Sequence, residues 1–562
     1  MKTMKVKFTY TILAGALGIA GLLSACNGDL LDVKPTDRIS DEAIASDSSL
    51  FEDFVINRYM GVRLMDKEAE GTPPGFGRGF EYALWASLTD EAIYNNDDNT
   101  WVVQRGQLAP ENTGIAGTLW SRSYRSIREC NYALAQIGAL KMSASRKQRL
   151  EAELKFIRAY RYHDLIRNYG SVVLMGDLVY ALQDNLSDPK LFQKSTIAEG
   201  LQYVTTQLDQ AASGLPANND SNWKLGRATK GAALALKSRL ALYAASPLYS
   251  AGSWQQAADA AKAVMTLGYS LHADYRSLFQ TPSSGEIIFE RLYAVGARHV
   301  CLEISNGPNG FGGWAGNSPL QNLVDAYEVK VDANTAVPFD WNNAAHVADP
   351  YANRDPRFYA SILYNGADYR GREIETFLPG GKDSKDGRDN WNASKTGYYL
   401  LKFLDDKLPI DNPWDVAGVQ PWIYLRYAEV LLNYAEAQNE VAGADASVYD
   451  AINQIRDRAG MPDLPAGLTQ SEMREAIRRE RQVELAFEEH RFYDVRRWKI
   501  AIDTENEPAY GISITKNADN SLTYAKKVAL DGRKFEEQHY WLPIPRAEIL
   551  SSGNQLDQNP NY

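Results

Sequence analysis

The strongest candidate for catalytic chemistry is a group of glutamates in the segment RRERQVELAFEEHRFYDVRRW (478–498). Glu480, Glu484 and Glu488 recur every four residues, so a helix through this segment would place their carboxylates on one face. Two neighbouring carboxylates are what a glycosidase requires. The segment also holds six arginines, which are Arg478, Arg479, Arg481, Arg491, Arg496 and Arg497. Carboxylates among so many guanidinium groups form charge-assisted hydrogen bonds that fix packing, so we interpret the helix as a structural clamp.

Other catalytic and metal-binding motifs are absent from the sequence. The six histidines never occur as HExxH or as a close pair, so the sequence does not indicate a zinc site. There is no GxSxG nucleophile elbow and no GxxxxGKS or GxxxxGKT phosphate loop. The glycine-rich stretches GFGRG and GFGGWAG lack the spacing of a dinucleotide site. The sequence therefore predicts no catalytic residue, no metal and no cofactor, and it leaves open whether a calcium ion supports the loops.

Two long segments have the composition of ordered loops. Residues 71–117 and 301–422 are rich in Gly, Asn, Asp and Pro and contain few helical patterns. Disordered segments are poor in aromatic residues. These segments instead hold seven tryptophans, which are Trp85, Trp101, Trp314, Trp341, Trp391, Trp414 and Trp422. We expect loops and short hairpins on a rigid frame, which is where binding residues usually lie.

The frame is predicted to be helical. Five stretches show apolar residues at helical spacing, and they cover residues 150–170, 228–247, 254–269, 423–441 and 448–462. The second pairs with the third and the fourth with the fifth, each pair spanning about 40 residues, close to the ~34-residue tetratricopeptide unit. Further helices are predicted near 118–140 and 195–213. The helical frame would then cover about 118–270 and 423–498.

The N-terminus has the layout of a secretory signal peptide. Lys2, Lys5 and Lys7 precede an uncharged apolar run from Phe8 to Ala25, which is at the short limit for a membrane-spanning helix of about 20 residues. Leu-Ser-Ala-Cys at 23–26 resembles the lipobox of bacterial lipoproteins. That resemblance implies cleavage after residue 25 and acylation of Cys26 as a lipid anchor, so the mature chain would be tethered to a membrane without spanning it. A secreted protein with a chance cysteine is the alternative.

The charge of the chain argues against nucleic-acid partners. The net charge is −11, and removal of the three lysines of residues 1–25 makes it −14. Such a chain has no basic field to attract phosphate backbones. Two further cysteines, Cys130 and Cys301, are too few for a disulfide framework, and whether they pair stays open.

An ordered set of segments resembles the SusD/RagB family of outer-membrane nutrient-binding lipoproteins. Besides Cys26 and the arginine-rich segment, the set includes LWASLTDEAIY (84–94), LWSRSYRSIRECNYAL (119–134), ELKFIRAYRYHDLIRNYG (153–170), RYAEVLLNYAEAQNE (426–440) and YWLPIPRAEILSSGNQLDQNPNY (540–562). The resemblance implies a mostly α, SusD-like fold over residues 26–562, a single domain with four tetratricopeptide-like helix pairs and long loop and short-hairpin insertions. It also implies a surface-exposed protein of the outer membrane with no enzymatic activity. Such a protein would capture oligosaccharides or glycans for a SusC-like TonB-dependent transporter.

Within that interpretation, the segment NNDDNTW (95–101) is the first candidate for ligand contact. A sugar ring has an apolar C–H face that stacks on an aromatic ring, and its hydroxyls exchange hydrogen bonds with amides and carboxylates. Trp101 is predicted to stack, with Asn96, Asp98 and Asn99 as polar partners.

Further candidates lie in the other loops. Trp314 lies between glycines that would permit a tight exposed turn, and Arg78 could donate to hydroxyls. Trp391 with Asn392 completes the set. Ordinary loop packing is the alternative for each residue, and Trp314 is also compatible with a framework role. Four other tryptophans are predicted to lie in the core: Trp85, Trp120, Trp254 and Trp498.

Two other functions stay open. The same architecture can host different ligands, so the chain could capture peptides or other non-carbohydrate nutrients. An anchored glycoside hydrolase that uses carboxylates in the loops is the third possibility.

Overall fold

A computed structural model describes residues 47–59, 83–180, 184–218, 220, 223–294, 302–410 and 418–562. The signal peptide, Cys26, Arg78 and Cys301 lie outside the described residues. Helices dominate the architecture, which confirms the predicted mostly α fold. In the described part of the chain, no helix is long and apolar enough to cross a membrane.

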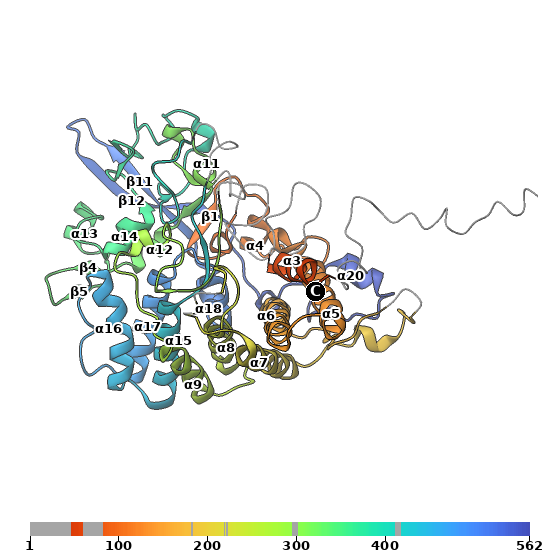
Figure 1. The fold of residues 1–562 in the computed structure, drawn as a ribbon. Coiled ribbons are helices and arrows are strands. Elements are labelled where there is room, and N and C mark those ends of the chain that lie inside the picture. Colours follow the sequence, from red (N-terminus) through yellow and green to blue (C-terminus); the bar gives the residue numbers. More distant parts are fainter. Residues whose placement is uncertain are drawn as a thin grey trace, which may run out of the picture.

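Packed helices form the frame (Figure 1). They are α3 (Ser48–Tyr59), α5 (Leu119–Gln136), α6 (Ala144–Tyr169), α7 (Ile197–Gly214), α8 (Lys230–Ala245), α9 (Trp254–Met265), α15 (Tyr427–Ala442), α16 (Ala446–Ala459), α17 (Gln470–Glu484) and α18 (Arg491–Arg497). From α5 to α9 each helix packs against the next, and α9 packs against α15, which in turn packs against α16 and α17. The α9–α15 contact joins two parts of the frame that are far apart in the sequence.

Local signals in the sequence explain where several helices begin. Capping boxes start α7 at Thr196 with Glu199, α9 at Ser253 with Gln256, and α17 at Thr469 with Glu472. In each box the hydroxyl and the side chain three residues later satisfy backbone amides of the first turn. Buried alanines on α8 and α9 allow these two helices to approach closely.

Two predicted helix boundaries are wrong. Residues 423–426 belong to strand β10 (Trp422–Arg426), which pairs with β2 (Ile287–Arg291), and α15 begins only at Tyr427. The segment WIYLR is buried along its whole length, so tertiary pairing with β2 overrides the helical spacing. The helix through the three glutamates ends at Glu484, and Glu488 lies in the turn that follows. In that turn Phe487 and Glu489 adopt left-handed backbone angles, with φ of 64° and 67°, which a helix cannot contain.

The loop-rich part of the chain is built from two-stranded ribbons and short helices. The remaining strands pair as β1 (Ala92–Tyr94) with β3 (Asn317–Pro319), β4 (Val329–Lys330) with β5 (Ala336–Val337), β6 (Ile362–Leu363) with β9 (Tyr399–Leu400), β7 (Asp368–Tyr369) with β8 (Arg372–Glu373), and β11 (Ala509–Lys516) with β12 (Leu522–Leu530), all antiparallel. The short helices are α4 (Trp101–Gln104), α10 (Tyr275–Leu278), α11 (Leu302–Asn306), α12 (Gln321–Ala326), α13 (Ala344–Ala348), α14 (Pro356–Ser361), α19 (Ala501–Thr504) and α20 (Arg546–Ser551).

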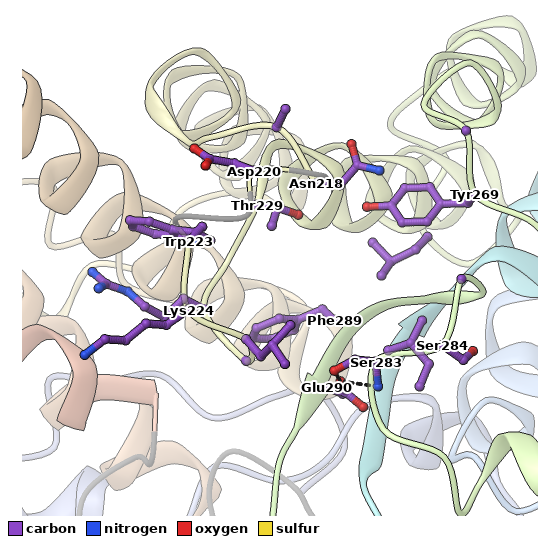
Figure 2. Close-up of a pocket in the computed structure, with 18 residues that line it drawn as sticks. Asn218, Asp220, Trp223, Lys224, Thr229, Tyr269, Ser283, Ser284, Phe289 and Glu290 are labelled. Carbon is purple, nitrogen blue, oxygen red and sulfur yellow. Dashed lines mark hydrogen bonds between the residues drawn. The ribbon is translucent and has the colours of Figure 1, made fainter.

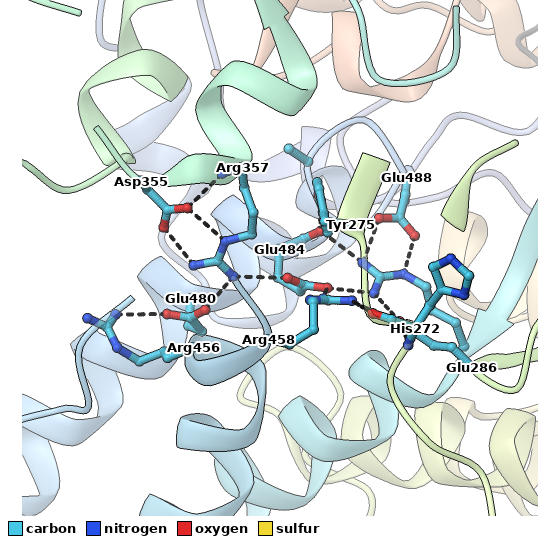
Figure 3. Close-up of polar contacts among 12 residues, drawn as sticks. His272, Tyr275, Glu286, Asp355, Arg357, Arg456, Arg458, Glu480, Glu484 and Glu488 are labelled. Atoms are coloured by element: carbon cyan, nitrogen blue, oxygen red, sulfur yellow. Dashed lines mark hydrogen bonds and ion pairs between the residues drawn. The ribbon is translucent and has the colours of Figure 1, made fainter. Parts of the chain in front are cut away.

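A buried ionic network ties this loop-rich part to the frame (Figure 3). Its centre is Glu484 at the end of α17, which accepts hydrogen bonds from Arg357 at 2.9 Å, from Arg426 at 2.6 Å, and from Arg458. Arg357 lies on α14, Arg426 ends β10, and Arg458 lies on α16. One carboxylate therefore joins four elements of the fold.

The neighbouring glutamates are paired as well. Glu480 accepts from Arg357 at 2.5 Å and from Arg456 at 3.1 Å. Glu488, in the turn after α17, accepts from Arg426 at 2.7 Å and from Lys402 at 2.7 Å. All three glutamates are buried. The interpretation of this segment as a clamp is therefore confirmed, although Glu488 reaches the network from a turn and not from the helix.

The network also controls the ionisation of its central carboxylate. Burial by itself would raise the pKa of Glu484. The guanidinium groups of Arg458, Arg426 and Arg357 outweigh this effect and hold the pKa well below its ordinary value. Glu484 is thus a fixed negative charge within a structural cluster.

Replacement of this charge is predicted to destabilise the fold. Glu484→Gln leaves three buried guanidinium groups without their shared carboxylate, so the free energy of unfolding in urea should fall by about 3–5 kcal/mol at pH 7. Because the folded-state pKa of Glu484 is lowered, its contribution is complete above the unfolded value near 4.5 and is lost as the pH falls. The difference between wild type and variant should therefore shrink below about pH 4.5.

Glu475 provides the matched control. It pairs with Arg478 on the same helix but is exposed, so Glu475→Gln should change stability by less than about 1 kcal/mol. Equal losses in the two variants would contradict the central position of Glu484.

Candidate ligand-binding surface

The turn after β1 carries the first candidate segment. Asp97, Asp98 and Asn99 adopt left-handed backbone angles with φ of 73°, 43° and 63°. Asn and Asp tolerate this conformation better than most residues. The Asp97 carboxylate accepts a 2.8 Å hydrogen bond from the backbone amide of Trp101. Part of the polar character of NNDDNTW is therefore required by the turn itself.

Trp101 is a half-buried residue of this turn. Its indole Nε1 donates to the Tyr94 carbonyl at 2.9 Å, and its ring packs against the small buried cluster of Ile93, Leu320, Ala509 and Leu530. Two cations approach the ring, with the Arg105 guanidinium 4.9 Å and the Lys395 ammonium 5.4 Å from its centre. Trp101 thus anchors the turn, and only part of its ring is accessible to a ligand.

Hydrogen bonds bring a second candidate segment to this turn. Asn96 donates from Nδ2 to the Asn392 side-chain oxygen at 3.2 Å. The buried Asn95 accepts from the Lys395 backbone amide at 2.9 Å and donates to the Ala393 carbonyl at 3.3 Å. The segments around Asn95 and Asn392, almost 300 residues apart in the sequence, are therefore adjacent in the fold.

Trp391 is the exposed aromatic residue of this region. It lies in a short 3-10 turn (Asn390–Asn392) that follows the left-handed Asp389, and its side chain is 69% exposed. Among the tryptophans that the structure describes, it alone is exposed. Asn392 beside it is buried. An exposed indole next to a fixed amide pair is a surface suited to a flat ligand with an apolar face.

Trp314 has a different environment. It is half-buried against the main core, and its backbone amide donates to the Ile304 carbonyl at 2.7 Å. A side chain at Gly313 would collide with the backbone of Gly307, and one at Gly316 with the backbone of Ser305. The glycines around Trp314 therefore serve close packing, and the predicted tight exposed turn is wrong. The loop still adjoins the surface, because the Gly316 carbonyl accepts from Asn95 at 2.8 Å.

Sequence reasoning missed the cations of this surface. Arg388 is exposed and pairs with Asp389 at 3.0 Å, and half-buried Lys395 bonds the Asn95 carbonyl through its ammonium group. Burial lowers the pKa of Lys395. Both residues belong to the stretch KDGRDNWNASK (385–395) around Trp391. The alternating charges beside a tryptophan in this stretch could have indicated that cations lie at the surface.

We use the term loop surface for the residues that these contacts bring together, namely Asn96, Asp98, Asn99, Trp101, Arg388, Trp391, Asn392 and Lys395. Asn99 is exposed and Asp98 is half-buried. The set offers an aromatic face, amides and cations, which suit reversible binding. Within the described ranges, no group of three or more His, Cys, Asp and Glu is placed to hold a metal ion.

The fold and the loop surface together define a mostly helical protein that displays the Trp391 indole and polar side chains on inserted loops. A family model described as the SusD family matches residues 275–562, just over half of the chain. A second model, described as starch-binding and associating with the outer membrane, matches residues 31–242. The chain belongs to the SusD family.

Individual relatives agree with this assignment. A SusD-like protein of Formosa agariphila is 24% identical over 522 residues, which cover 85% of this chain and 90% of the relative. A SusD-like protein of Bacteroides fragilis has a TM-score of 0.76 and 30% identity, covering 94% of this chain and 100% of its own. A second B. fragilis structure, described as a SusD-like carbohydrate-binding protein, has a TM-score of 0.73 and 26% identity over 91% and 99% of the two chains.

Asn95 is predicted to hold the two halves of the loop surface together. Asn95→Ala removes its side-chain bonds to Ala393 and Lys395, so the free energy of unfolding should fall by about 1–3 kcal/mol. The Lys395 amide should lose its protection in hydrogen exchange, because its acceptor is gone. Exposed Asn390→Ala is the matched control, because its backbone is not left-handed, and it should leave that amide unchanged. Unchanged protection in Asn95→Ala would refute the bridging role.

Proposed function

We propose that this protein is a non-enzymatic glycan-binding lipoprotein of the outer-membrane surface. Its mature chain, residues 26–562, would form one domain that captures oligosaccharides on the loop surface. It would pass them to a SusC-like TonB-dependent transporter without altering them. The observation that carries the proposal is the exposed Trp391 indole beside the Asn96–Asn392 amide pair.

The chemistry of the loop surface suits a sugar. The apolar C–H face of a sugar ring would stack on Trp391, while its hydroxyls exchange hydrogen bonds with Asn96, Asn99 and Arg388. Each such hydroxyl replaces bonds to water, so the net gain is only about 1 kcal/mol apiece. Affinity should therefore lie between about micromolar and millimolar, or roughly 4–8 kcal/mol. Such affinity permits release to a transporter.

Two features support binding without catalysis. The best candidate carboxylates, Glu480, Glu484 and Glu488, are buried and paired with arginines or lysine. They are therefore inaccessible to a glycan. The carbohydrate-binding description of the B. fragilis relative points the same way.

Trp391→Ala is the direct test of the loop surface. Calorimetry or affinity electrophoresis with the mature chain and a panel of plant, host and bacterial glycans should give saturable binding to at least one of them. Loss of the stacking ring should weaken this binding at least about fivefold, or roughly 1 kcal/mol. Leu550→Ala, which removes another exposed apolar side chain on α20, should leave the affinity unchanged.

Other results would point to the competing functions. Release of shorter sugars from a glycan would identify a hydrolase. Saturable binding of peptides and of no glycan would identify capture of another nutrient by the same architecture.

Cys26 is proposed to be the lipid anchor. Cys26→Ala removes the acylation site, so metabolic labelling with a radioactive fatty acid should no longer mark the protein. The protein should also move out of the detergent phase in a Triton X-114 partition, because no acyl chain remains to enter the membrane. Persistent labelling of the variant would show that the anchor lies elsewhere.

A further inference from the structure

A pocket lies on the helical frame (Figure 2). It lies between the connection from α7 to α8 and the start of strand β2, and none of its lining residues belongs to the loop surface. Its volume is about 290 Å³. Ligand pockets of about 300 Å³ and above hold small organic molecules, so this one suits a single ring or two.

One wall of the pocket is a preorganised indole. Trp223 donates from Nε1 to the Ala228 carbonyl at 2.8 Å, and the Arg227 guanidinium lies 4.1 Å from its ring centre. Arg227 is itself fixed by ion pairs with Glu52 at 2.6 Å and with Glu153. The ring is therefore held in place before a ligand arrives, which reduces the entropic cost of binding.

A second aromatic wall comes from strand β2. Phe289 stacks on Tyr424 with ring centres 5.3 Å apart, and meets Phe156 edge-on at 5.2 Å. Tyr269 lines the pocket from the side opposite Trp223 (Figure 2). Rings of this kind supply the apolar contact that a sugar ring needs.

The polar part of the pocket includes an incompletely satisfied carboxyl group. Glu290 is only 6% exposed, and one of its oxygens accepts from the Ser283 amide at 2.9 Å and from the Ser283 hydroxyl at 3.0 Å. The other oxygen, Oε2, has no hydrogen-bond partner. Burial raises the pKa of this carboxyl. A buried acceptor without a donor costs about 1–3 kcal/mol, which a hydroxyl of a ligand would recover.

Ser283, which donates two hydrogen bonds to the Glu290 carboxyl, has a strained backbone. Ser283 has a left-handed φ of 59°, which is uncommon for a residue other than Gly, Asn or Asp. This conformation accompanies the Ser283 amide bond to Glu290. Strained residues of this kind concentrate at binding sites.

We propose that this pocket is a second binding site, which takes one neutral sugar ring or the end of a short oligosaccharide. The Trp223 and Phe289 rings would contact its apolar face, and Glu290 would accept hydrogen bonds from its hydroxyls. The Arg227 guanidinium is paired with Glu52 and Glu153, so it is not available to an acidic sugar. The charged side chains of Asp220 and Lys224 also line the pocket, and because they are of opposite sign the lining does not favour an acidic over a neutral ligand. The inference rests on the lining of the pocket and stands even if the loop surface binds another ligand.

Saturation-transfer NMR on the mature chain tests this site. The probes are glucose, galactose, mannose and N-acetylglucosamine at millimolar concentration, and at least one of them should receive saturation from the protein. Trp223→Leu should reduce that signal at least fivefold and Glu290→Gln at least threefold. Ser284→Phe places a ring in the pocket from a partly exposed position, and it should abolish the signal. It also removes the 3.3 Å hydrogen bond that the Ser284 hydroxyl accepts from the Glu286 amide, so its stability must be measured.

Trp391→Ala separates this site from the loop surface. The monosaccharide signal should persist in that variant, whereas binding of the longer glycan should weaken. Three results would overturn the proposal: no signal from any of the four sugars, a signal that survives Ser284→Phe, or a signal that Trp391→Ala alone removes. Thermal unfolding of Ser284→Phe within a few degrees of wild type shows that its effect is local.

Discussion

The fold depends on a carboxylate that three arginines share. Glu484 meets Arg357, Arg426 and Arg458 in a buried site, and these residues come from α17, α14, β10 and α16. Apolar residues of the loop-rich part, such as Tyr327 and Phe358, share the main core with the frame helices, and the ionic network adds directional contacts to that packing. Because buried ion pairs require exact partners, the network also fixes how α14 and its neighbouring ribbons sit on the frame. The same pairing buries these glutamates and occupies their carboxylates, so the segment with the best catalytic pattern in the sequence serves the packing of the fold.

The loop surface is held together by a strand pair and by the hydrogen bonds of Asn95. β1 pairs with β3, and the turn that follows β1 is held to the 389–396 segment by Asn95. Some aromatic residues of these loops pack inward and hold the loops in place, whereas another faces solvent. Trp101 and Trp314 pack against buried clusters, whereas the Trp391 indole is left uncovered. Under the proposed function, loops fixed in this way would favour capture, because loops that become ordered only on binding lose conformational entropy at each encounter.

The pocket beside Trp223 extends this description to the helical frame. Its walls come from the α7–α8 connection and from β2, the strand that also pairs with β10 next to the ionic network. The α7–α8 connection contributes the Trp223 indole, and β2 contributes the Phe289 ring and the buried Glu290 carboxyl. Under the proposal of a second site, the frame would bind a ligand as well as support the loops.

The sequence by itself determined the helical class, the main helix pairs and the structural role of the arginine-rich segment, because apolar spacing, capping residues and charge composition are local properties. It also indicated that residues near Trp101 and Trp391 belong to ordered loops. Only the tertiary structure decided that residues 423–426 form a strand and that Glu488 reaches its arginine from a turn. It alone decided that the glycines beside Trp314 serve packing and that Asn96 meets Asn392. The strand, the Glu488 pairing and the Asn96–Asn392 contact depend on partners far away in the chain, and a local pattern carries no information about such partners. The glycines meet residues only 6 and 11 positions away, but that contact depends on how the loop folds back on itself, which glycine spacing does not show.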